Sequence, residues 1–146
     1  MRYLGLDVGD VRIGVALSDE TATLASGLLT LQRVGSRKDV RAVAALVREH
    51  DVGEVVVGMP FRLDGTLGPQ GEKVTVFVEA LRRTLAVPVT TWDERLTSVA
   101  ADELLAEAGV RRRDRKARID RAAAVLILQG YIDTLPSRAG AGEEGP

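Results

Sequence analysis

The sequence predicts a single α/β domain in which helices cover both faces of a mixed five-stranded sheet. Three short apolar runs come first, separated by turn residues. Two further apolar runs then alternate with segments of helical periodicity. Strands that follow one another directly pair antiparallel, whereas strands joined through a helix run parallel. With 146 residues, the chain is long enough for one such domain and its core.

The first three strands are expected at the start of the chain. Tyr3–Val8 and Val11–Leu17 are rich in apolar and β-branched residues, and Gly9-Asp10 between them is a turn signal. These two runs therefore predict an antiparallel hairpin. Leu24–Leu31 is a weaker third strand because Gly27 interrupts it.

A helix and a buried strand follow. Ser36 is expected to cap a helix that starts near Arg37, because apolar residues recur there at helical spacing, and Gly53 is expected to close that unit. Glu54 to Gly58 is a continuous run of β-branched residues, as expected for a strand covered on both faces.

The rest of the chain continues the alternation. A long loop is expected over Met59–Gly71, which carries two prolines and several glycines. After it the sequence predicts a helix over Glu72–Leu85, a strand over Pro88–Trp92, a helix over Arg95–Ala108 and a last helix over Arg113–Leu135. The apolar segment 122–128 of that last helix is expected to be buried. The domain should cover residues 1–135, and the Gly-, Ala- and Glu-containing tail 136–146 should be disordered.

Composition excludes several kinds of site. The chain has no cysteine and one histidine, which excludes thiolate zinc sites, cysteine nucleophiles and histidine-rich metal clusters. Its net charge of −1 lacks the strongly basic balance typical of nucleic-acid binders. We expect no signal peptide and no membrane span, and hence a cytoplasmic protein without a membrane partner.

Asp7 is the most informative residue. It lies near the end of a strand that is otherwise apolar, on the same face as Gly5. A buried carboxylate is costly unless it is paired or binds a metal. From the pattern alone, a metal-binding carboxylate and one paired with an arginine are about equally favoured.

A second acidic cluster, Asp93-Glu94, lies where a strand is expected to end. Sites in open α/β sheets form at the carboxyl ends of the strands. Because neighbours on a strand point in opposite directions, only one of the two should face Asp7. We favour Glu94 for its longer reach, and Asp93 remains the alternative. Capping of the next helix would explain both residues without a function.

Asp120 lies between a basic half-helix, Arg111–Arg121, and an apolar half-helix. Position alone favours a surface carboxylate that balances neighbouring arginines, but small residues one turn on would let this face lie close to the sheet. Arg12, Arg95 and Arg118 are candidates for contacts with phosphate.

Four segments together resemble a known family. They are Leu6-Asp7-Val8-Gly9 with Arg12-Ile13-Gly14-Val15-Ala16, Val57-Gly58-Met59-Pro60 with Asp64-Gly65-Thr66, Asp93-Glu94-Arg95-Leu96-Thr97-Ser98, and Ile119-Asp120 with Ala122–Leu128. In this order and spacing they resemble the YqgF/RuvX family of Holliday-junction-resolvase-like proteins, also described as pre-16S rRNA nucleases. Ser98 stands where the family often has Thr, which changes no carboxylate.

The resemblance implies a ribonuclease-H-like fold and a metal-dependent nuclease site. In that site Asp7 would be the central ligand, the Asp93-Glu94 pair would supply the second carboxylate and Asp120 the third. Oxygen ligands suit Mg²⁺ or Mn²⁺, and a two-metal arrangement needs no protein nucleophile. We expect Asp7, Glu94 and Asp120 to be both the metal ligands and the catalytic residues.

The expected activity is hydrolysis of phosphodiester bonds in structured nucleic acid. The resemblance favours processing of the pre-16S rRNA end, with Holliday-junction resolution as a second substrate class. Ribosome-assembly factors are expected partners, and the chain should be a monomer or a weak homodimer. One alternative is a non-catalytic nucleic-acid-binding module for ribosome assembly. Another, an ATP-handling protein with a similar phosphate hairpin, would need a second lobe for which the chain is too short.

Overall fold

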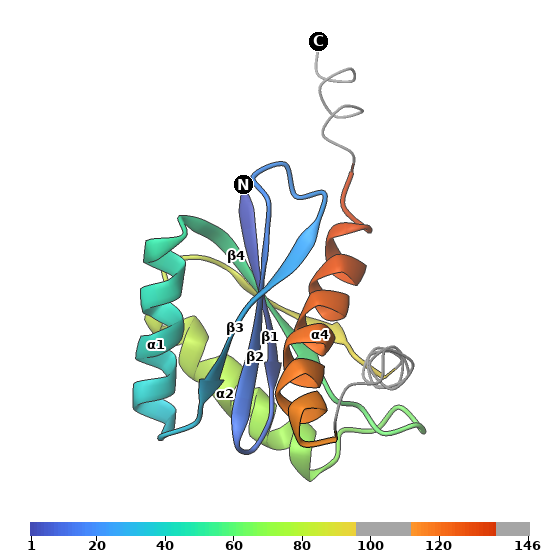
Figure 1. Cartoon of the computed structure of the whole chain (residues 1–146). Coiled ribbons are helices and arrows are strands. Elements are labelled where there is room, and N and C mark those ends of the chain that lie inside the picture. Colours follow the sequence, from blue (N-terminus) through green and yellow to red (C-terminus); the bar gives the residue numbers. More distant parts are fainter. Residues whose placement is uncertain (96–111, 137–146) are drawn as a thin grey trace.

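The computed structural model describes residues 1–95 and 112–136, and for residues 112–120 only the backbone. Its sheet has the strand order β3-β2-β1-β4-β5 (Figure 1). The elements are β1 Arg2–Val8, β2 Arg12–Ser18, β3 Ala25–Gln32, α1 Ser36–Glu49, β4 Val52–Met59, α2 Pro69–Thr84, β5 Val89–Asp93 and α4 Arg112–Ile132. The expected helix over Arg95–Ala108 and the expected tail disorder lie outside the described residues.

The sheet is mixed, as the sequence predicts. β1 pairs with β2, and β2 with β3, in antiparallel ladders, whereas β1–β4 and β4–β5 are parallel. The Gly9 N–H donates to the Arg12 carbonyl oxygen at 2.8 Å and closes the first turn. The carboxyl ends of β1, β4 and β5 consequently lie at one end of the sheet.

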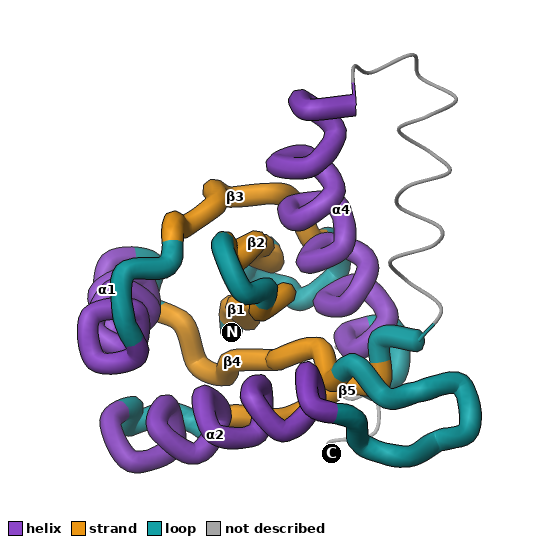
Figure 2. The backbone as a smooth tube through the Cα atoms, turned by 90° about the horizontal axis from the view of Figure 1, so that it is seen from below, coloured by secondary structure: helices purple, strands orange, loops and turns teal. Residues whose placement is uncertain are grey.

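Helices cover both faces. α1 and α2 pack on one face and α4 crosses the other, over β1, β2 and β3 (Figure 2). The first core is formed by apolar side chains of β1, β2, β4, α1 and α2, and Phe77, Leu4, Leu6 and Ile13 are among its largest members. The second core lies under α4 and is smaller.

α4 buries a stripe rather than its whole circumference in the apolar half. Ala123, Ala124, Ile127 and Leu128 have no exposed surface, whereas Val125 and Leu126 are half-buried. The helix approaches closely at Gly5, where a Cβ would lie 2.7 Å from Leu128 Cβ and 3.1 Å from the Ala124 carbonyl oxygen. Gly5 therefore sets how near α4 comes to β1.

Three local predictions were wrong. α1 begins at Ser36 itself, with Gly35 as N-cap and no side-chain cap, because Gly35 takes a φ of 155° that favours glycine. Gly53 lies within β4, where the Met1 side chain fills the space a Cβ would need, and Asp51 with φ 53° makes the turn before it. α2 begins at Pro69 and shortens the expected loop, since proline is well suited to the first turn of a helix.

Among the described residues, no helix is long and apolar enough to cross a membrane.

Candidate active site

Asp7 lies on the α4 face of the sheet between two glycines. The antiparallel register pairs Asp7 with Gly14 of β2. The parallel register pairs Leu6 with Val57, so Gly58 of β4 follows on the other side of Asp7. Since glycine has no side chain, other groups can come close to the half-buried Asp7 carboxylate from either neighbouring strand.

Glu94 reaches Asp7 from the end of β5. The Glu94 N–H donates to the Met59 carbonyl oxygen at 3.2 Å, which continues the β4–β5 ladder one residue beyond β5. Alternation along the extended backbone returns Glu94 to the α4 face, where its side chain is hydrogen-bonded with Asp7. The two carboxyl groups therefore lie within hydrogen-bonding reach of each other, at the end of the sheet where β1, β4 and β5 finish.

Burial is the main influence on Glu94. Desolvation raises the pKa of its carboxyl above the ordinary value, the hydrogen bond with Asp7 lowers it, and the charge of Asp93 raises it. Burial and the Asp93 charge thus both disfavour the ionised form of Glu94, which a nearby positive charge would favour. Such a site is suited to a cation.

Gly58 makes room for the Glu94 carboxylate. A Cβ at position 58 would collide with Glu94 Oε2 and with Ile127 Cδ1. In the sequence, Gly58 stands out only as part of a family motif, which assigns it no role. The available signal was a glycine inside a run of β-branched residues, which indicates close approach of another group.

Asp93 points elsewhere and is paired with Arg95. Arg95 Nε lies 2.8 Å from Asp93 Oδ2, and the Arg95 N–H donates to Asp93 Oδ1 at 3.0 Å. The side-chain hydrogen bond from Arg95 holds the pKa of Asp93 below its usual value. The Arg95 guanidinium also lies 5.8 Å from the Phe61 ring centroid. Geometry therefore brings Glu94, and not Asp93, to Asp7.

The loop after β4 is an ordered hairpin. Phe61 and Leu67 form a bridge, and the Arg62 N–H donates to the Thr66 carbonyl oxygen at 2.8 Å. Asp64 accepts hydrogen bonds from the Thr66 N–H and hydroxyl at 2.9 and 2.6 Å. The Asp64 carboxylate is therefore used by the turn itself.

The remaining predicted site residues are placed only in part. Arg12 is half-buried and begins β2, beside the turn that follows Asp7. Asp120 and Arg118 lie on α4, Asp120 four residues before Ala124, and their side chains are outside the described residues. Among the described side chains, no group of three metal-binding residues occurs.

Sequence reasoning missed a buried ion pair behind the Asp7 turn. Arg33 Nε lies 3.0 Å from Asp39 Oδ2, and Arg33 Nη1 donates to the Gly9 carbonyl oxygen at 3.0 Å. Asp39 is only 3% exposed. The pair joins the start of α1 to the turn at the end of β1. In the sequence, Arg33 and Asp39 look like ordinary surface charges, because the pairing depends on tertiary contacts.

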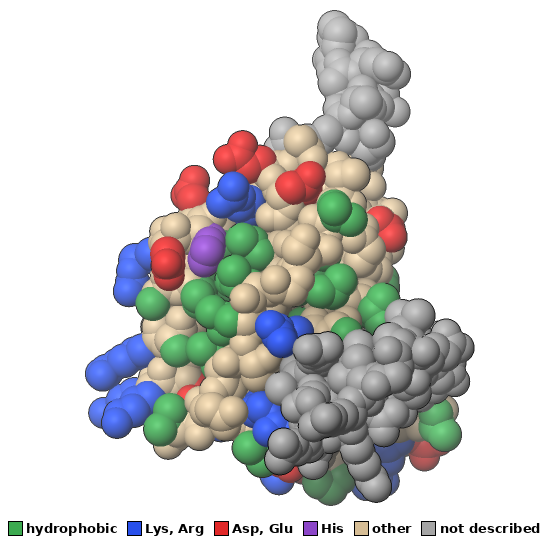
Figure 3. Space-filling view, in the orientation of Figure 1, with side chains coloured by type: hydrophobic (Ala, Val, Ile, Leu, Met, Phe, Trp, Pro, Cys, Tyr) green, Lys and Arg blue, Asp and Glu red, His purple; other side chains and the backbone are tan. Residues whose placement is uncertain are grey.

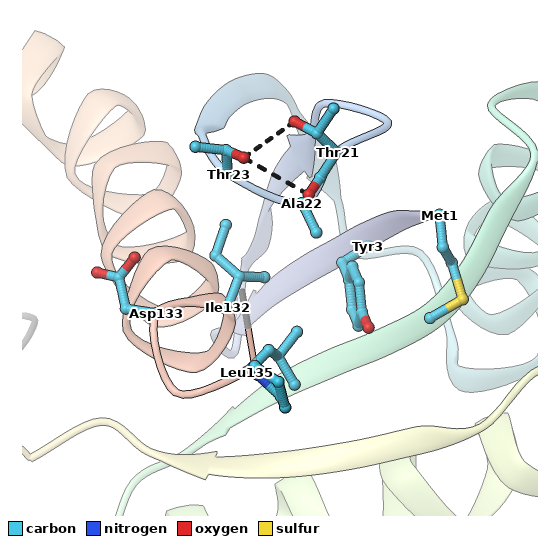
Figure 4. Close-up of a pocket in the computed structure, with 9 residues that line it drawn as sticks. Met1, Tyr3, Thr21, Ala22, Thr23, Ile132, Asp133 and Leu135 are labelled. Carbon is cyan, nitrogen blue, oxygen red and sulfur yellow. Dashed lines mark hydrogen bonds between the residues drawn. The ribbon is translucent and has the colours of Figure 1, made fainter. Parts of the chain in front are cut away.

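A pocket of about 500 Å³ lies at the other end of β1 (Figure 4). It is lined by the start of β1, the β2–β3 loop and the end of α4, with Tyr3, Thr23 and Ile132 among its residues. Asp133 is the one carboxylate among its described lining residues. The pocket therefore lacks the acidic pair found at Asp7.

The family model and the sequence relatives agree on one family, to which this chain belongs. The family model described as "RuvX: Holliday junction resolvase" matches residues 1–134. A protein of Thermoanaerobacter pseudethanolicus named "Putative pre-16S rRNA nuclease" is 50% identical over 135 residues, 92% of this chain and 97% of the relative. A protein of Clostridioides difficile with the same name is 50% identical over 132 residues, 90% of this chain and 94% of the relative.

Solved structures confirm the ribonuclease-H-like fold. The T. thermophilus RuvC in complex with a Holliday junction substrate superposes with a TM-score of 0.59 at 16% identity, over 92% of this chain and 97% of that one. The Fowlpox virus resolvase in complex with Holliday junction DNA gives a TM-score of 0.57 at 12% identity, over 92% and 98% of the two chains. At these identities the similarity establishes the fold alone.

Proposed function

Because the chain belongs to the RuvX family, we propose that it is a metal-dependent nuclease that cleaves the precursor of 16S ribosomal RNA. The observation that carries the proposal is the Asp7–Glu94 pair, flanked by glycines, at the carboxyl ends of β1, β4 and β5. Paired carboxylates can hold the metal ions that assist hydrolysis of a phosphodiester.

The residues present fit a hard divalent cation. Asp7 and Glu94 offer only oxygen donors, and burial, with a smaller contribution from the Asp93 charge, raises the pKa of Glu94. We propose Mg²⁺ or Mn²⁺, held by Asp7 and Glu94 together with Asp120 of α4. When bound, such ions activate water and stabilise the leaving oxygen.

The chain's own residues bind and orient the substrate. Gly14 lies opposite Asp7 and places no side chain beside its carboxylate, and Gly58 leaves the space that the Glu94 carboxylate fills. Asp7 and Glu94 would hold the cation through their carboxylate oxygens. Arg12, Arg95 and Arg118 are the proposed phosphate contacts, of which Arg95 is held in place by Asp93 and Phe61.

The choice of RNA over junction DNA follows from the nearer relatives. Chains about half identical over nearly their whole length carry the pre-16S rRNA name, whereas the junction-bound structures share only the fold. Asp7 and Glu94 come from one chain, so a monomer suffices for a single cut. A four-way junction would need two such sites. Ribosome-assembly factors are the proposed partners because the substrate is a ribosomal precursor.

The test is cleavage of a 16S precursor RNA and of a four-way DNA junction, side by side, with Mg²⁺ or Mn²⁺. We expect the RNA to be cut, and Asp7→Asn to abolish cutting while its circular dichroism spectrum stays unchanged. Full activity of Asp7→Asn would overturn the site assignment. Preferred cutting of the junction would overturn the substrate. A chain that binds RNA equally with and without the metal, and never cuts it, would instead be a non-catalytic assembly module.

A further inference from the structure

A basic cavity lies between α1 and α2, on the face of the sheet opposite α4. Its volume is about 350 Å³. Arg37 and Arg41 line it from the first turns of α1, and Arg83 lines it from the last turn of α2. Figure 3 shows basic side chains projecting on the side of the molecule where α1 lies.

The charges of this cavity are not neutralised by nearby acids. Among the described residues, Arg37, Arg41 and Arg83 make no ion pair with a carboxylate. Of the acidic groups on these helices, Glu49 and Glu72 lie at the helix ends away from the cavity, and the other two have partners. Asp39 is buried against Arg33, and Glu79 lies 3.5 Å from Arg82. The cavity therefore carries a local positive charge that the net charge of −1 conceals.

The chemistry of the lining fits phosphate groups. Guanidinium groups from two helices can each make bidentate contacts with phosphate oxygens, and the hydroxyls of Ser36 and Thr84 add donors. The first turn of α1 contributes the positive end of a helix dipole. The described lining includes no aromatic or amide side chain that would stack on or read a base. The lining is thus suited to a nucleic-acid backbone, independent of sequence.

The cavity begins at the same end of the sheet as the active site. Arg33, two residues before the α1 N-cap, donates to the carbonyl oxygen of Gly9 at 3.0 Å. Gly9 directly follows β1, which carries Asp7. A strand leaving Asp7 can therefore pass the β1–β2 turn and continue along the start of α1.

We propose that this cavity binds the phosphate backbone of an RNA segment that flanks the point of cleavage. This inference rests on the proposed nuclease function and extends it to a second binding surface. Substrate RNA then contacts both faces of the sheet, with the cut made on the α4 face and an anchoring contact made on the α1–α2 face. Long RNA gains affinity from the anchor, whereas a short fragment occupies the active site alone.

The experiment compares two double variants that remove the same charge. Arg41→Ala with Arg83→Ala removes one cavity arginine from each helix. Arg2→Ala with Arg48→Ala is the matched control, because these residues lie outside the cavity lining. Both pairs are placed in the Asp7→Asn chain, and binding of single-stranded RNA of about 30 nucleotides is measured at several salt concentrations.

We expect the cavity variant to bind the long RNA roughly tenfold more weakly at low salt, with a slope of log affinity against log salt smaller by about one. An RNA of about eight nucleotides should bind it as it binds the control. Equal slopes for the two variants, or an equal loss with the short RNA, would overturn the inference. Since cleavage is not the readout, failure of the parent chain to cut RNA would contradict the proposed function separately.

Discussion

Glycines on β1, β2 and β4 shape the surroundings of Asp7, each for a different reason. Gly5 lets α4 approach, Gly14 lies opposite Asp7 in the ladder, and Gly58 leaves room for Glu94. None of them takes a left-handed conformation in this structure. Their role is therefore to leave space rather than to relieve backbone strain.

We predict that Gly58→Ala lowers nuclease activity at least tenfold with a modest loss of stability. The added Cβ collides with the ends of the Glu94 and Ile127 side chains. Relief of the collision displaces the Glu94 carboxylate from Asp7. Overpacking of this kind costs about 1–3 kcal/mol. Gly27→Ala is the matched control, because a Cβ at Gly27 of β3 would make only ordinary contacts, at 3.7 Å or more. Cleavage rate and urea unfolding check both variants. Unchanged activity of Gly58→Ala would contradict the role given to Glu94.

We predict that Asp39→Ala lowers the free energy of unfolding by about 3 kcal/mol at neutral pH, because it leaves Arg33 with an unpaired, largely buried charge. Burial would raise the pKa of Asp39, but the Val34 N–H and Arg33 outweigh it and hold the pKa below its usual value. Removing Lys73, whose pair with Asp10 is exposed, should cost less than about 1 kcal/mol.

The same pair has a pH dependence of known sign. A depressed native pKa means that the stabilisation is fully present above about pH 4, the unfolded value, and is lost as the pH falls through the native pKa. The difference in unfolding free energy between the parent chain and Asp39→Ala should therefore shrink below pH 4. A difference that stays constant down to pH 2 would show that packing, and not the charge, holds Asp39.

At the scale of elements, the sequence best predicts the features that depend on residues close together in the chain, such as turns and the order of strands and helices. The hairpin followed from Gly9-Asp10, and the order of strands and helices followed from hydrophobic periodicity. Ser36 was misplaced because an N-cap depends on backbone dihedrals that Gly35 adopts more easily. The choice between Asp93 and Glu94 stayed open, because alternation gives the face of each residue only once the register of β5 against β4 is known.

α4 is fixed to the sheet by a polar contact within its apolar stripe. The Tyr131 hydroxyl donates to Glu54 Oε2 at 2.5 Å, and the Thr90 hydroxyl donates to the same oxygen at 3.0 Å. Trp92 and Tyr3 rings lie 6.0 Å from the Tyr131 ring. The contact joins α4 to β4 and β5, whereas most of the helix packs on β1, β2 and β3.

We predict that Tyr131→Phe destabilises the chain by about 1–2 kcal/mol, because the Glu54 carboxylate loses a partly buried donor. Burial and the nearby Glu54 carboxylate raise the pKa of Tyr131 to about 12. A raised native pKa means that the stabilisation is fully present below about pH 10 and is lost as the pH rises toward 12. As the pH rises from 8 to 12, the free energy of unfolding of the parent chain, measured with a chemical denaturant, should fall toward that of Tyr131→Phe. Parallel curves over that window would contradict the prediction.

For the whole molecule, the net charge of −1 averages over regions of opposite sign. The α4 face holds the acidic pair at Asp7, whereas the far side of the sheet holds the uncompensated arginines of α1 and α2. A basic total is therefore not needed for a protein to bind phosphate, provided that cations neutralise its acidic site. The local distribution becomes visible only when the strands and helices are placed in space.

Binding of a cation at the acidic pair would link the stability of the whole chain to the metal concentration. A cation that binds the folded site and not the unfolded chain stabilises by about 2.7 kcal/mol at a hundred times its dissociation constant. We predict that Mn²⁺ or Mg²⁺ raises the unfolding temperature of the parent chain in a concentration-dependent way, and that a chelator reverses the rise. Asp7→Asn should lose this response, whereas the Arg41→Ala, Arg83→Ala variant should keep it, because the cavity binds phosphate and not cations. An equal rise in Asp7→Asn would place the cation elsewhere. The metal-dependent rise in unfolding temperature reports on the carboxylate pair and requires no substrate. The salt dependence of RNA binding reports on the cavity and requires no metal. Each surface is therefore tested separately.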